Sequence, residues 1–394
     1  MKIVIWGTGH LSRLIEDYIR KDIQIVAYVD NNKMRGGGMI KTFERTVTIM
    51  LPNNTKNLEF DYCLIAVVHY QEILLQCLHK LNIPDEKILI VPKMFEWNKD
   101  LLLKIFDENI YCNPRDYTIQ NIKVDLGENH ALPLYQKRYK MYDRFIPYLA
   151  QITQKKEGKC IIDIGANVGD TLTGMWKHTE DRFYCIEPVT EFFNLLTDNA
   201  KRLGNMERVC LEQAFITDNM EENYQAIVSD KGTASKIRTD ENIKSIPSKT
   251  VDYLIAEKGI RYDEVDLLKI DTDGFDADCI ISAKELLEES EALIFWENYN
   301  ETCEQYQKYL EAYQLLDKKG YFTFFVFDNY GNYLCRGGID TIHSILDYMQ
   351  RVNTDCIGNT FHYFDVLACK EKDVKLCERL IMQYLDNYPL FRIS

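Results

Sequence analysis

A turn rich in glycine follows an apolar strand near the middle of the chain. The predicted strand Cys160–Ile164 contains Asp163, and the turn Gly165-Ala166-Asn167-Val168-Gly169 leads into a helix. Glycine lets the backbone turn tightly and approach a ligand closely, while the start of a helix offers unpaired N–H groups. A second strand, Arg182–Ile186, ends in Glu187, whose carboxylate can accept both hydroxyls of a ribose. The spacing of about 20 residues from turn to acid predicts a β-α-β unit that holds an adenosine-bearing cofactor.

The charges around this turn favour a cationic cofactor. The dinucleotide pattern G-x-G-x-x-G is absent here, and Asp163 and Asp170 would repel a pyrophosphate. S-adenosylmethionine carries a sulfonium and an amino group, so the same acids favour it over NAD. An ordinary buried strand and tight turn is the alternative interpretation, and the complete context of strand, turn, helix, strand and acid argues against it. The predicted cofactor-binding residues are Asp163, Gly165, Asn167, Gly169, Asp170, Thr171, Glu187, Pro188 and Ala214.

Polar residues that follow two later strands are candidates for the chemistry. Asp271 comes after one predicted strand, and Glu297 and Asn298 end the next. Open α/β sheets bind ligands at the carboxyl ends of their strands, so Asp271 and Glu297 are predicted catalytic residues that activate an acceptor hydroxyl. The oxygen atoms of Asp271, Glu297 and Asn298 could also hold Mg²⁺, which would lower the pKa of that hydroxyl. Alternatively, Asp271 caps a turn and Glu297 pairs with a nearby base. His130 is a further candidate for the catalytic base.

Composition limits the classes of protein. With 394 residues the chain is too long for one ordinary core, so two domains are expected. The net charge of −14 argues against a general role in binding nucleic acid or anionic lipid. The 12 cysteines form no C-x-x-C pair, which is typical of small core residues in a reducing compartment. The N-terminus enters a strand directly and no apolar run is long enough to span a membrane, so we expect a cytoplasmic protein.

A second glycine turn lies at the start of the chain. The predicted strand Lys2–Trp6 leads into Gly7-Thr8-Gly9, and another strand ends at Asp30. Ser12 stands where the third glycine of a dinucleotide site would be, so the pattern is weak. Three interpretations stay open for this turn: it binds NAD, it binds a nucleotide or nucleotide-sugar, or it is purely structural.

The order of elements predicts an α/β fold with two Rossmann-like domains. Residues 1–92 are expected to form a small domain with a parallel sheet. Residues 93–120 lose a clear hydrophobic period and are assigned to a linker. Residues 121–394 are expected to form a larger, doubly wound sheet with an antiparallel edge strand, preceded by a helix over Leu134–Gln154.

The chain from about Ile122 to Lys370 resembles the FkbM family of S-adenosylmethionine-dependent methyltransferases. Ile162–Thr171 looks like the cofactor loop of that family, Ile186-Glu187-Pro188 like its ribose-binding acid, and Leu268–Asp276 like its second signature. The second signature departs from the commoner Val-Glu-Gly-Phe-Glu at Thr272–Asp276, where the carboxylates are kept but are shorter. This difference preserves the charge and alters the distances to a metal or substrate.

The resemblance extends to the regions before the cofactor loop. His130–Pro133 and Tyr142–Phe145 are similar to the lead-in of family members that modify cell-surface sugars, and the first domain resembles small nucleotide-sugar-binding domains through Ile5–Gly9 and Tyr28–Asn32. These resemblances imply a class I methyltransferase fold and O-methylation of a sugar or nucleotide-sugar used in surface polysaccharide biosynthesis. Two other functions stay open. One is an NAD-dependent sugar-nucleotide oxidoreductase or epimerase, and the other is a non-catalytic module that senses S-adenosylmethionine.

Overall fold

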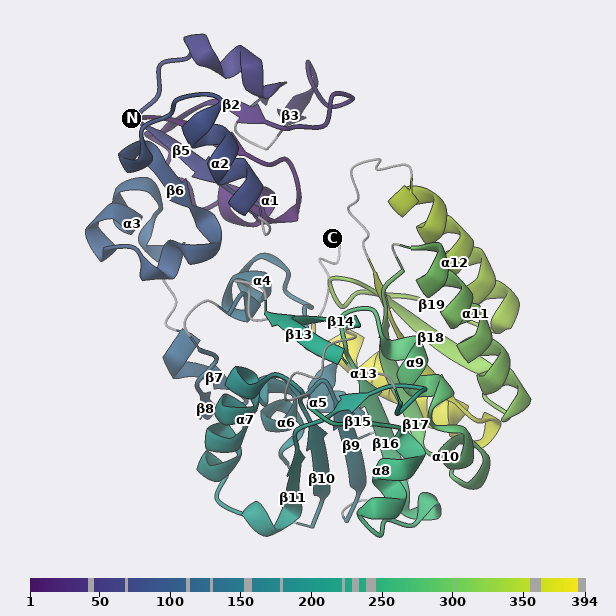
Figure 1. Ribbon diagram of the computed structural model, residues 1–394. Coiled ribbons are helices and arrows are strands. Elements are labelled where there is room, and N and C mark those ends of the chain that lie inside the picture. The colour runs from purple at the N-terminus through teal and green to yellow at the C-terminus, as the bar shows by residue number, and fades with distance from the viewer. Residues whose placement is uncertain are drawn as a thin grey trace. The chain divides into compact units, whose positions relative to one another are not determined.

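The computed structural model describes residues 1–41, 46–67, 70–110, 114–127, 130–151, 158–177, 180–221, 224–228, 234–238, 246–300, 302–354 and 363–388. The chain forms two compact units (Figure 1). The first unit consists of Met1–Pro114 and Glu128–Arg138, and the second of Arg115–Gly127, Tyr139–Val228 and Thr233–Ser394. Each unit is built around its own sheet.

A mostly parallel sheet forms the centre of the first unit. Its strands lie in the order β3-β4-β2-β1-β5-β6, and β3 alone runs antiparallel to its neighbour. The strands are β1 (Lys2–Trp6), β2 (Gln24–Val29), β3 (Met39–Lys41), β4 (Thr46–Met50), β5 (Tyr62–Ile65) and β6 (Ile88–Ile90). The helices are α1 (His10–Glu16), α2 (Gln71–His79), α3 (Lys99–Ile105) and α4 (Leu132–Arg138). The chain winds from β1 to one side and returns to β5 on the other, and open α/β sheets bind ligands at such a reversal.

Residues 93–110 pack within the first unit. They include α3, and Leu102, Ile105 and Phe106 are buried. An isolated bridge joins Phe106 to Ile19. A linker was expected here because the apolar residues of this segment have no clear period. Short 3₁₀ turns at Val91–Glu96 and Glu108–Ile110 flank α3 and interrupt the period of an α-helix.

The second unit contains an eight-stranded sheet in the order β11-β10-β9-β16-β17-β20-β18-β19. The first five strands of this order run parallel, whereas β20 runs antiparallel between β17 and β18, and β19 is an antiparallel edge strand. The strands are β9 (Cys160–Ile164), β10 (Arg182–Ile186), β11 (Val209–Glu212), β16 (Val265–Ile270), β17 (Leu293–Asn298), β18 (Thr323–Asp328), β19 (Tyr333–Gly337) and β20 (Phe364–Cys369). The predicted doubly wound α/β fold is confirmed, and its winding reverses between β9 and β16.

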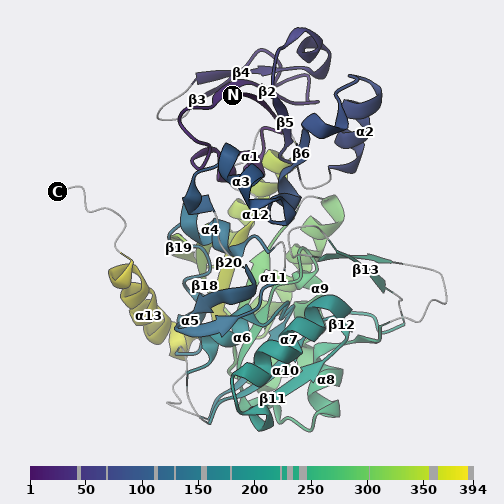
Figure 2. The same ribbon diagram turned by 90° about the vertical axis from the view of Figure 1, so that its left-hand side faces the viewer.

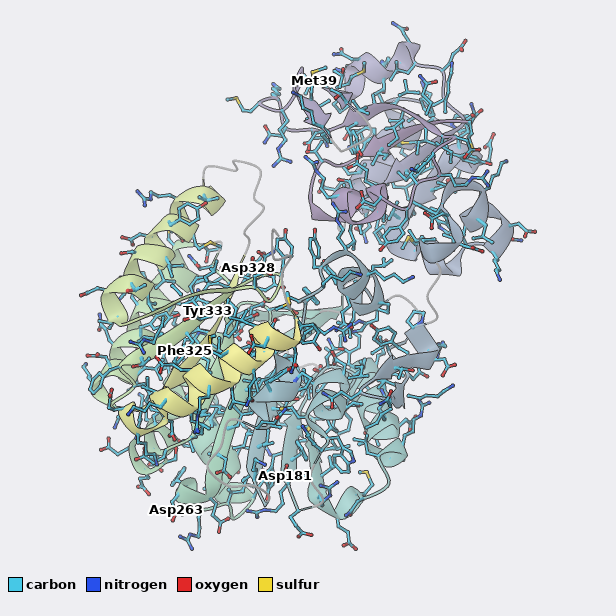
Figure 3. All side chains as sticks on the ribbon, turned by 180° about the vertical axis from the view of Figure 1, so that it is seen from behind. Met39, Asp181, Asp263, Phe325, Asp328 and Tyr333 are labelled. Carbon is cyan, nitrogen blue, oxygen red and sulfur yellow. The ribbon has the colours of Figure 1, made fainter. Side chains whose placement is uncertain are left out.

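Helices cover both faces of this sheet. One face packs against α8 (Val251–Glu257), α9 (Asp276–Ile281), α10 (Lys284–Glu289), α11 (Cys303–Lys318) and α12 (Ile339–Thr354). The other packs against α5 (Ile146–Leu149), α6 (Asp170–Met175), α7 (Thr190–Arg202) and α13 (Val374–Asn387). In Figure 2, α13 and α11 lie on opposite sides of β18 and β20. Figure 3 shows α13 beside Phe325 and Tyr333, which belong to the same apolar core.

Smaller strand pairs complete the second unit. They are β7 (Tyr117–Ile119) with β8 (Ile122–Val124), β12 (Phe215–Ile216) with β15 (Ser248–Lys249), and β13 (Tyr224–Val228) with β14 (Ala234–Arg238). Most cysteines in the described ranges are buried free thiols. No helix of the described residues combines the length and the apolar character that a membrane crossing requires.

The predicted helix over Leu134–Gln154 is wrong. The structure has two short helices, α4 and α5, separated by residues 139–145. Asp143 in this interval adopts a left-handed φ of +55°, which an α-helix does not allow, and Pro147 lies in the first turn of α5. The break is important for the site because it exposes Asp143 to a cavity at the end of the sheet.

Candidate active site

The glycine turn after β9 packs directly against the chain that leaves β16. Gly165 has a φ of +75°, and a Cβ atom there would lie 1.8 Å from the carbonyl oxygen of Asp271. The N–H of Gly165 donates to the carbonyl of Ile186 at the end of β10 (2.9 Å). Gly169 also has a positive φ, +85°, and a Cβ there would lie 2.9 Å from Leu196. Only glycine therefore fits Gly165, and the turn lies where the winding of the sheet reverses.

A buried ion pair between Asp163 and Lys269 stabilises the glycine turn. Asp163 is fully buried, accepts a hydrogen bond from the Thr171 hydroxyl (2.5 Å), and lies 3.1 Å from the ammonium of Lys269. Lys269 also donates to the carbonyl of Gly165 (3.4 Å) and lies 3.5 Å from Asp271. Burial lowers the pKa of Lys269, but the carboxylates of Asp163, Asp271 and Asp170 outweigh it and raise this pKa, so the ammonium stays charged. The charge of Asp163 is thus balanced inside the fold.

Lys269 is a site residue that the sequence analysis missed. It lies within an apolar strand, where a lysine is rarely buried without an acidic partner. This placement is the signal that could have found it. Its partner could not be chosen from the sequence, because several carboxylates follow the neighbouring strands.

Glu187 joins the turn to the end of β10. Its side chain is buried, and its two oxygens accept from the N–H groups of Asn167 (2.9 Å) and Val189 (2.8 Å). Burial raises the pKa of Glu187 to about 7, and the two backbone hydrogen bonds act in the opposite direction. Each carboxylate oxygen has a second lone pair, so the acid can hold the turn and still accept from a ribose hydroxyl.

The remaining predicted cofactor residues lie around the same edge. Asp170 begins α6, and burial raises its pKa to about 6. The carbonyl of Pro188 accepts from the Gln213 side chain (3.2 Å). Ala214 is fully buried between β11 and β12. These residues follow the carboxyl ends of β9, β10 and β11, the edge at which an open sheet binds its ligand.

Four carboxyl groups surround a small cavity at the adjoining strand ends. Asp271 and Glu297 line it as predicted, and Asp143 and Asp365 line it as well. Glu297 and Asp365 are directly opposite each other on β17 and β20. The volume is about 30 Å³, which is the size of one water molecule or one functional group. We call this space the carboxylate cavity.

Three of the four acids have a raised pKa. Burial raises the pKa of Asp143 to about 8, and repulsion from Asp170 and Asp271 adds to the effect. Burial, followed by repulsion from neighbouring carboxylates, also raises the pKa of Glu297 and of Asp365 well above the usual range. The side chain of Asp143 is exposed and lines the cavity. A carboxylate of raised pKa is a stronger base, so this cavity suits the removal of a proton from an acceptor.

The structure does not bring Asn298 to the other predicted metal ligands. Neighbouring residues of a strand point to opposite faces, so Asn298 points away from Glu297. Its oxygen accepts from the Tyr313 hydroxyl (2.9 Å) and its amide donates to Asn300 (3.3 Å), both on the α11 side. Over the ranges that the structure describes, no three His, Cys, Asp or Glu side chains are arranged to hold a metal ion. The predicted magnesium ligands therefore do not form a site as a group.

His130 is part of the first unit and does not line the carboxylate cavity. Its Nδ1 accepts from the N–H of Leu132 at the start of α4 (3.2 Å). Burial lowers its pKa to about 4, so the imidazole is neutral at physiological pH. This contact is local to the start of α4, and the catalytic role predicted for His130 stays a prediction.

The first unit has a crevice of about 310 Å³ at the reversal of its own sheet. The predicted residues Gly7-Thr8-Gly9 and Asp30 line it, together with Arg35. Thr8 donates to Asp30, and Arg35 donates to Thr8 (2.7 Å) and to Asp30 (3.3 Å). Gly7 has a φ of +106°, and a Cβ there would lie 2.7 Å from the carbonyl of Ala66. The turn thus needs its first glycine, and the charge of Asp30 is already balanced by Arg35.

A model of a methyltransferase family covers the glycine cradle and the central strands of the second unit. Residues 163–323 match the family model "Methyltransferase FkbM domain", which confirms the predicted resemblance. Residues 1–89 match the model "C2185-like, N-terminal", whose description names no ligand. No curated protein matches the chain.

The solved structures that match part of the chain include several methyltransferases. Methyltransferase FkbM from Methylobacillus flagellatus KT is 15% identical, with 75% of this chain and 79% of that chain covered and a TM-score of 0.31. A SAM-dependent O-methyltransferase from Thermotoga maritima is 17% identical (58% and 65% covered, TM-score 0.32). An O-methyltransferase from Bacillus cereus in complex with SAH is 12% identical (61% and 89% covered, TM-score 0.34). These TM-scores are too low to carry function from one protein to another.

Proposed function

We propose that the protein transfers a methyl group from S-adenosylmethionine to a hydroxyl of a sugar or nucleotide-sugar used in surface polysaccharide biosynthesis. One observation carries the proposal: Asp271 belongs to both halves of the site. Its backbone carbonyl packs against the glycine turn, and its side chain lines the carboxylate cavity. A cofactor in the cradle and an acceptor hydroxyl in the cavity would therefore meet at this residue.

The residues of the site have separate tasks in this proposal. Glu187 accepts hydrogen bonds from the ribose, while Lys269 holds the glycine turn and Asp271 in register. When bound, S-adenosylmethionine supplies an electrophilic methyl group. Glu297 accepts the proton of the acceptor hydroxyl, and Asp143 and Asp365 share protons with it so that the cavity is not overcharged. The apolar walls from Phe145, Phe295 and Phe327 exclude water.

Calorimetry tests the cofactor. We expect S-adenosylmethionine to bind the wild-type protein and to bind much more weakly to Glu187→Ala and Asp163→Ala. Glu191→Ala is the matched control, because Glu191 is exposed on α7 and should leave the affinity unchanged. Equal binding by all three variants would remove the cradle from the proposal.

Turnover tests the reaction. Incubation with a panel of sugars and nucleotide-sugars should release S-adenosylhomocysteine and give an acceptor heavier by one methylene. Cofactor binding with no product over the whole panel would favour a module that senses S-adenosylmethionine. Binding of NADH with no binding of S-adenosylmethionine would favour the oxidoreductase.

The proposed transfer needs no Mg²⁺, because Asn298 bonds to Tyr313 and points away from the carboxylate cavity. We expect methyl transfer to persist after dialysis against EDTA. Loss of activity that magnesium restores would instead place the ion among the carboxylates of Asp271 and Glu297.

The crevice of the first unit supports a second proposal, that this unit holds the nucleotide part of a nucleotide-sugar. The specific observation is Arg35, a cation that lines the crevice beside the glycine turn. Trp6 lines the same crevice, so its fluorescence can follow titrations with UDP-glucose, GDP-mannose and NAD. Arg35→Ala should weaken nucleotide-sugar binding and leave S-adenosylmethionine affinity unchanged. No response to any of the three ligands would leave this unit a structural role.

A further inference from the structure

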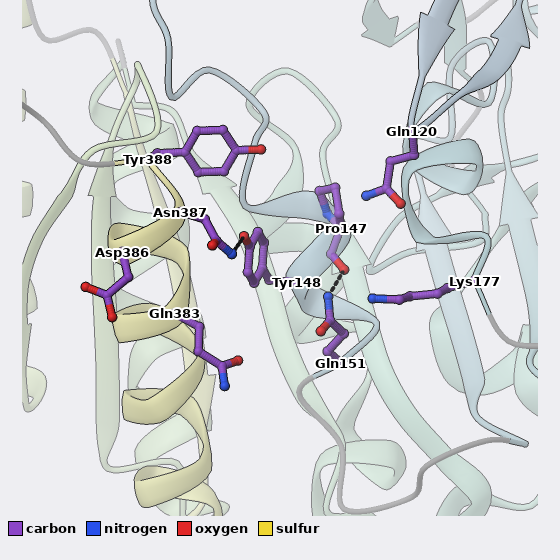
Figure 4. A pocket seen from close by; sticks show the side chains of 9 residues that line it. All are labelled: Gln120, Pro147, Tyr148, Gln151, Lys177, Gln383, Asp386, Asn387 and Tyr388. Carbon is purple, nitrogen blue, oxygen red and sulfur yellow. Dashed lines mark hydrogen bonds between the residues drawn. The ribbon is translucent and has the colours of Figure 1, made fainter.

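A groove on the second unit lies between α13 and the end of α5 (Figure 4). We call it the amide groove, because four of its lining side chains are the carboxamides of Gln120, Gln151, Gln383 and Asn387. Its volume of about 480 Å³ falls within the roughly 300–1,000 Å³ of small-ligand sites. None of its lining residues belongs to the cofactor cradle or to the carboxylate cavity.

The lining excludes several classes of ligand. Among the described lining residues, Lys177 and Asp386 carry one charge each of opposite sign, so this part of the groove has no net charge with which to attract a phosphate or a nucleic acid. Pro147 is the single aliphatic residue of the lining within the ranges that the structure describes. An apolar ligand or the apolar face of a helix would find too little apolar surface here. An uncharged, strongly hydrogen-bonding ligand remains.

Tyrosine rings and amides together suit a saccharide. Each amide offers a donor and an acceptor in one plane, which matches a pair of neighbouring hydroxyls on a sugar ring. Tyr148 and Tyr388 line the groove and supply aromatic faces for the C–H surface of such a ring. Both rings pack on buried Tyr384, at centroid distances of 5.5 and 5.6 Å, so they are held in place.

The groove is partly organised in advance. Asn387 donates to the Tyr148 hydroxyl (2.6 Å) and Gln151 donates to the carbonyl of Pro147 (3.1 Å), as the dashed lines of Figure 4 show. These bonds fix the two amides and direct their planes. The side-chain amides of Gln120 and Gln383 have no hydrogen-bond partner among the described residues and are available to a ligand. Figure 4 shows Gln120 across the groove from α13. Preorganised groups lose less entropy when a ligand binds.

One short segment connects the groove with the site of methyl transfer. Phe145 and Ile146 line the carboxylate cavity, and the next two residues, Pro147 and Tyr148, line the amide groove. We propose that the amide groove binds an uncharged part of a saccharide acceptor, remote from the hydroxyl that is methylated. The inference rests on the proposed function, in that the acceptor is a saccharide. Remote contacts of this kind can hold an acceptor in the orientation that the reaction needs.

The test separates saccharide binding from turnover. The full-length protein without cofactor is applied to an array of bacterial surface-polysaccharide fragments that also carries maltohexaose and chitohexaose, and the strongest binder is titrated by calorimetry. We expect binding to at least one uncharged glycan, and a loss of about tenfold in affinity for Gln120→Ala/Gln383→Ala. Gln314→Ala is the matched control, because Gln314 is exposed on α11 outside the groove.

Two outcomes would overturn the inference. One is that no glycan of the array binds the wild-type protein. The other is that the double variant binds the selected glycan as tightly as the control does. Glycan binding is measured without S-adenosylmethionine and is therefore independent of methyl transfer. If the groove binds glycans and the protein transfers no methyl group, only the proposed function is refuted. Methyl transfer with no glycan binding in the groove would refute only this inference.

Discussion

Substitution of Lys269 by methionine should disable the cofactor site and destabilise the second unit. Lys269 and Asp163 are 1% and 0% exposed and 3.1 Å apart, so the substitution leaves a buried carboxylate without its cation. Removal of one partner of a buried pair costs roughly 3–5 kcal/mol. For a unit of this size that corresponds to a fall in Tm of about 6–20 °C. Loss of the contacts to Gly165 and Asp271 should also weaken S-adenosylmethionine binding by at least about tenfold.

Lys159 provides a matched control for this prediction. It forms a second buried pair with Asp181, with the same exposures of 1% and 0% and a distance of 3.7 Å, at the opposite end of β9. Lys159→Met should therefore cost similar stability and leave cofactor affinity unchanged. Lys269→Met/Asp163→Asn should recover much of the lost stability, because no unpaired charge remains.

Scanning calorimetry measures Tm, and the transition that S-adenosylmethionine shifts upward identifies the second unit. Isothermal calorimetry measures cofactor affinity. A Lys269→Met protein that unfolds within about 2 °C of wild type would show that the buried pair is worth about 1 kcal/mol or less, against the expected loss. Equal weakening of cofactor binding by Lys159→Met and Lys269→Met would likewise contradict the expected result.

Three further predictions concern the turn, the carboxyl groups and the base. Gly165→Ala should lower the free energy of unfolding by roughly 2–5 kcal/mol in a urea titration, because the strain of a left-handed φ adds to an overlap with the backbone of Asp271. Gly204→Ala is the control: Gly204 has a φ of +87° but nothing within 4 Å, so the loss should be about 1–2 kcal/mol. Equal losses for the two variants would refute the close approach to Asp271. Without ligand, Tm of the second unit should fall from pH 6.5 to pH 8.5. Three acids bind more protons when folded than when unfolded: the pKa is about 7 for Glu187 and Asp276 and about 8 for Asp143. Their contribution to the stability of the folded unit is therefore full below about pH 4 and is lost as pH rises through these values. Asp143→Asn should flatten this slope, and an unchanged slope would contradict its raised pKa. Glu297→Gln should lower kcat by about 100-fold or more with cofactor affinity unchanged, while Glu311→Gln on α11 should behave as wild type; an active Glu297→Gln would assign the base to another carboxyl group.

The local sequence pattern was sufficient to predict the cofactor cradle. The strands β1, β9 and β10 have the bounds that the sequence predicts, because short apolar runs between turn residues are buried strands in any parallel sheet. Gly165 and Glu187 were predicted from spacing alone, because a β-α-β unit brings the end of one strand beside the end of the next. The opposite directions of Glu297 and Asn298 could also have been predicted, since neighbouring residues alternate along a strand.

The carboxylate cavity was decided by tertiary structure. Asp143 reaches it through a break that no helical period reveals, and Asp365 reaches it because β20 inserts antiparallel between β17 and β18. The partner of Lys269 was also decided by tertiary structure, because Asp163 lies opposite Lys269 only when β9 and β16 are neighbours. The sequence by itself determined which segments become strands and which turns require glycine, because those depend on forces between residues close in the chain. Only the folded sheet decided which acids share a cavity and which share a cation, because that depends on strand order and register.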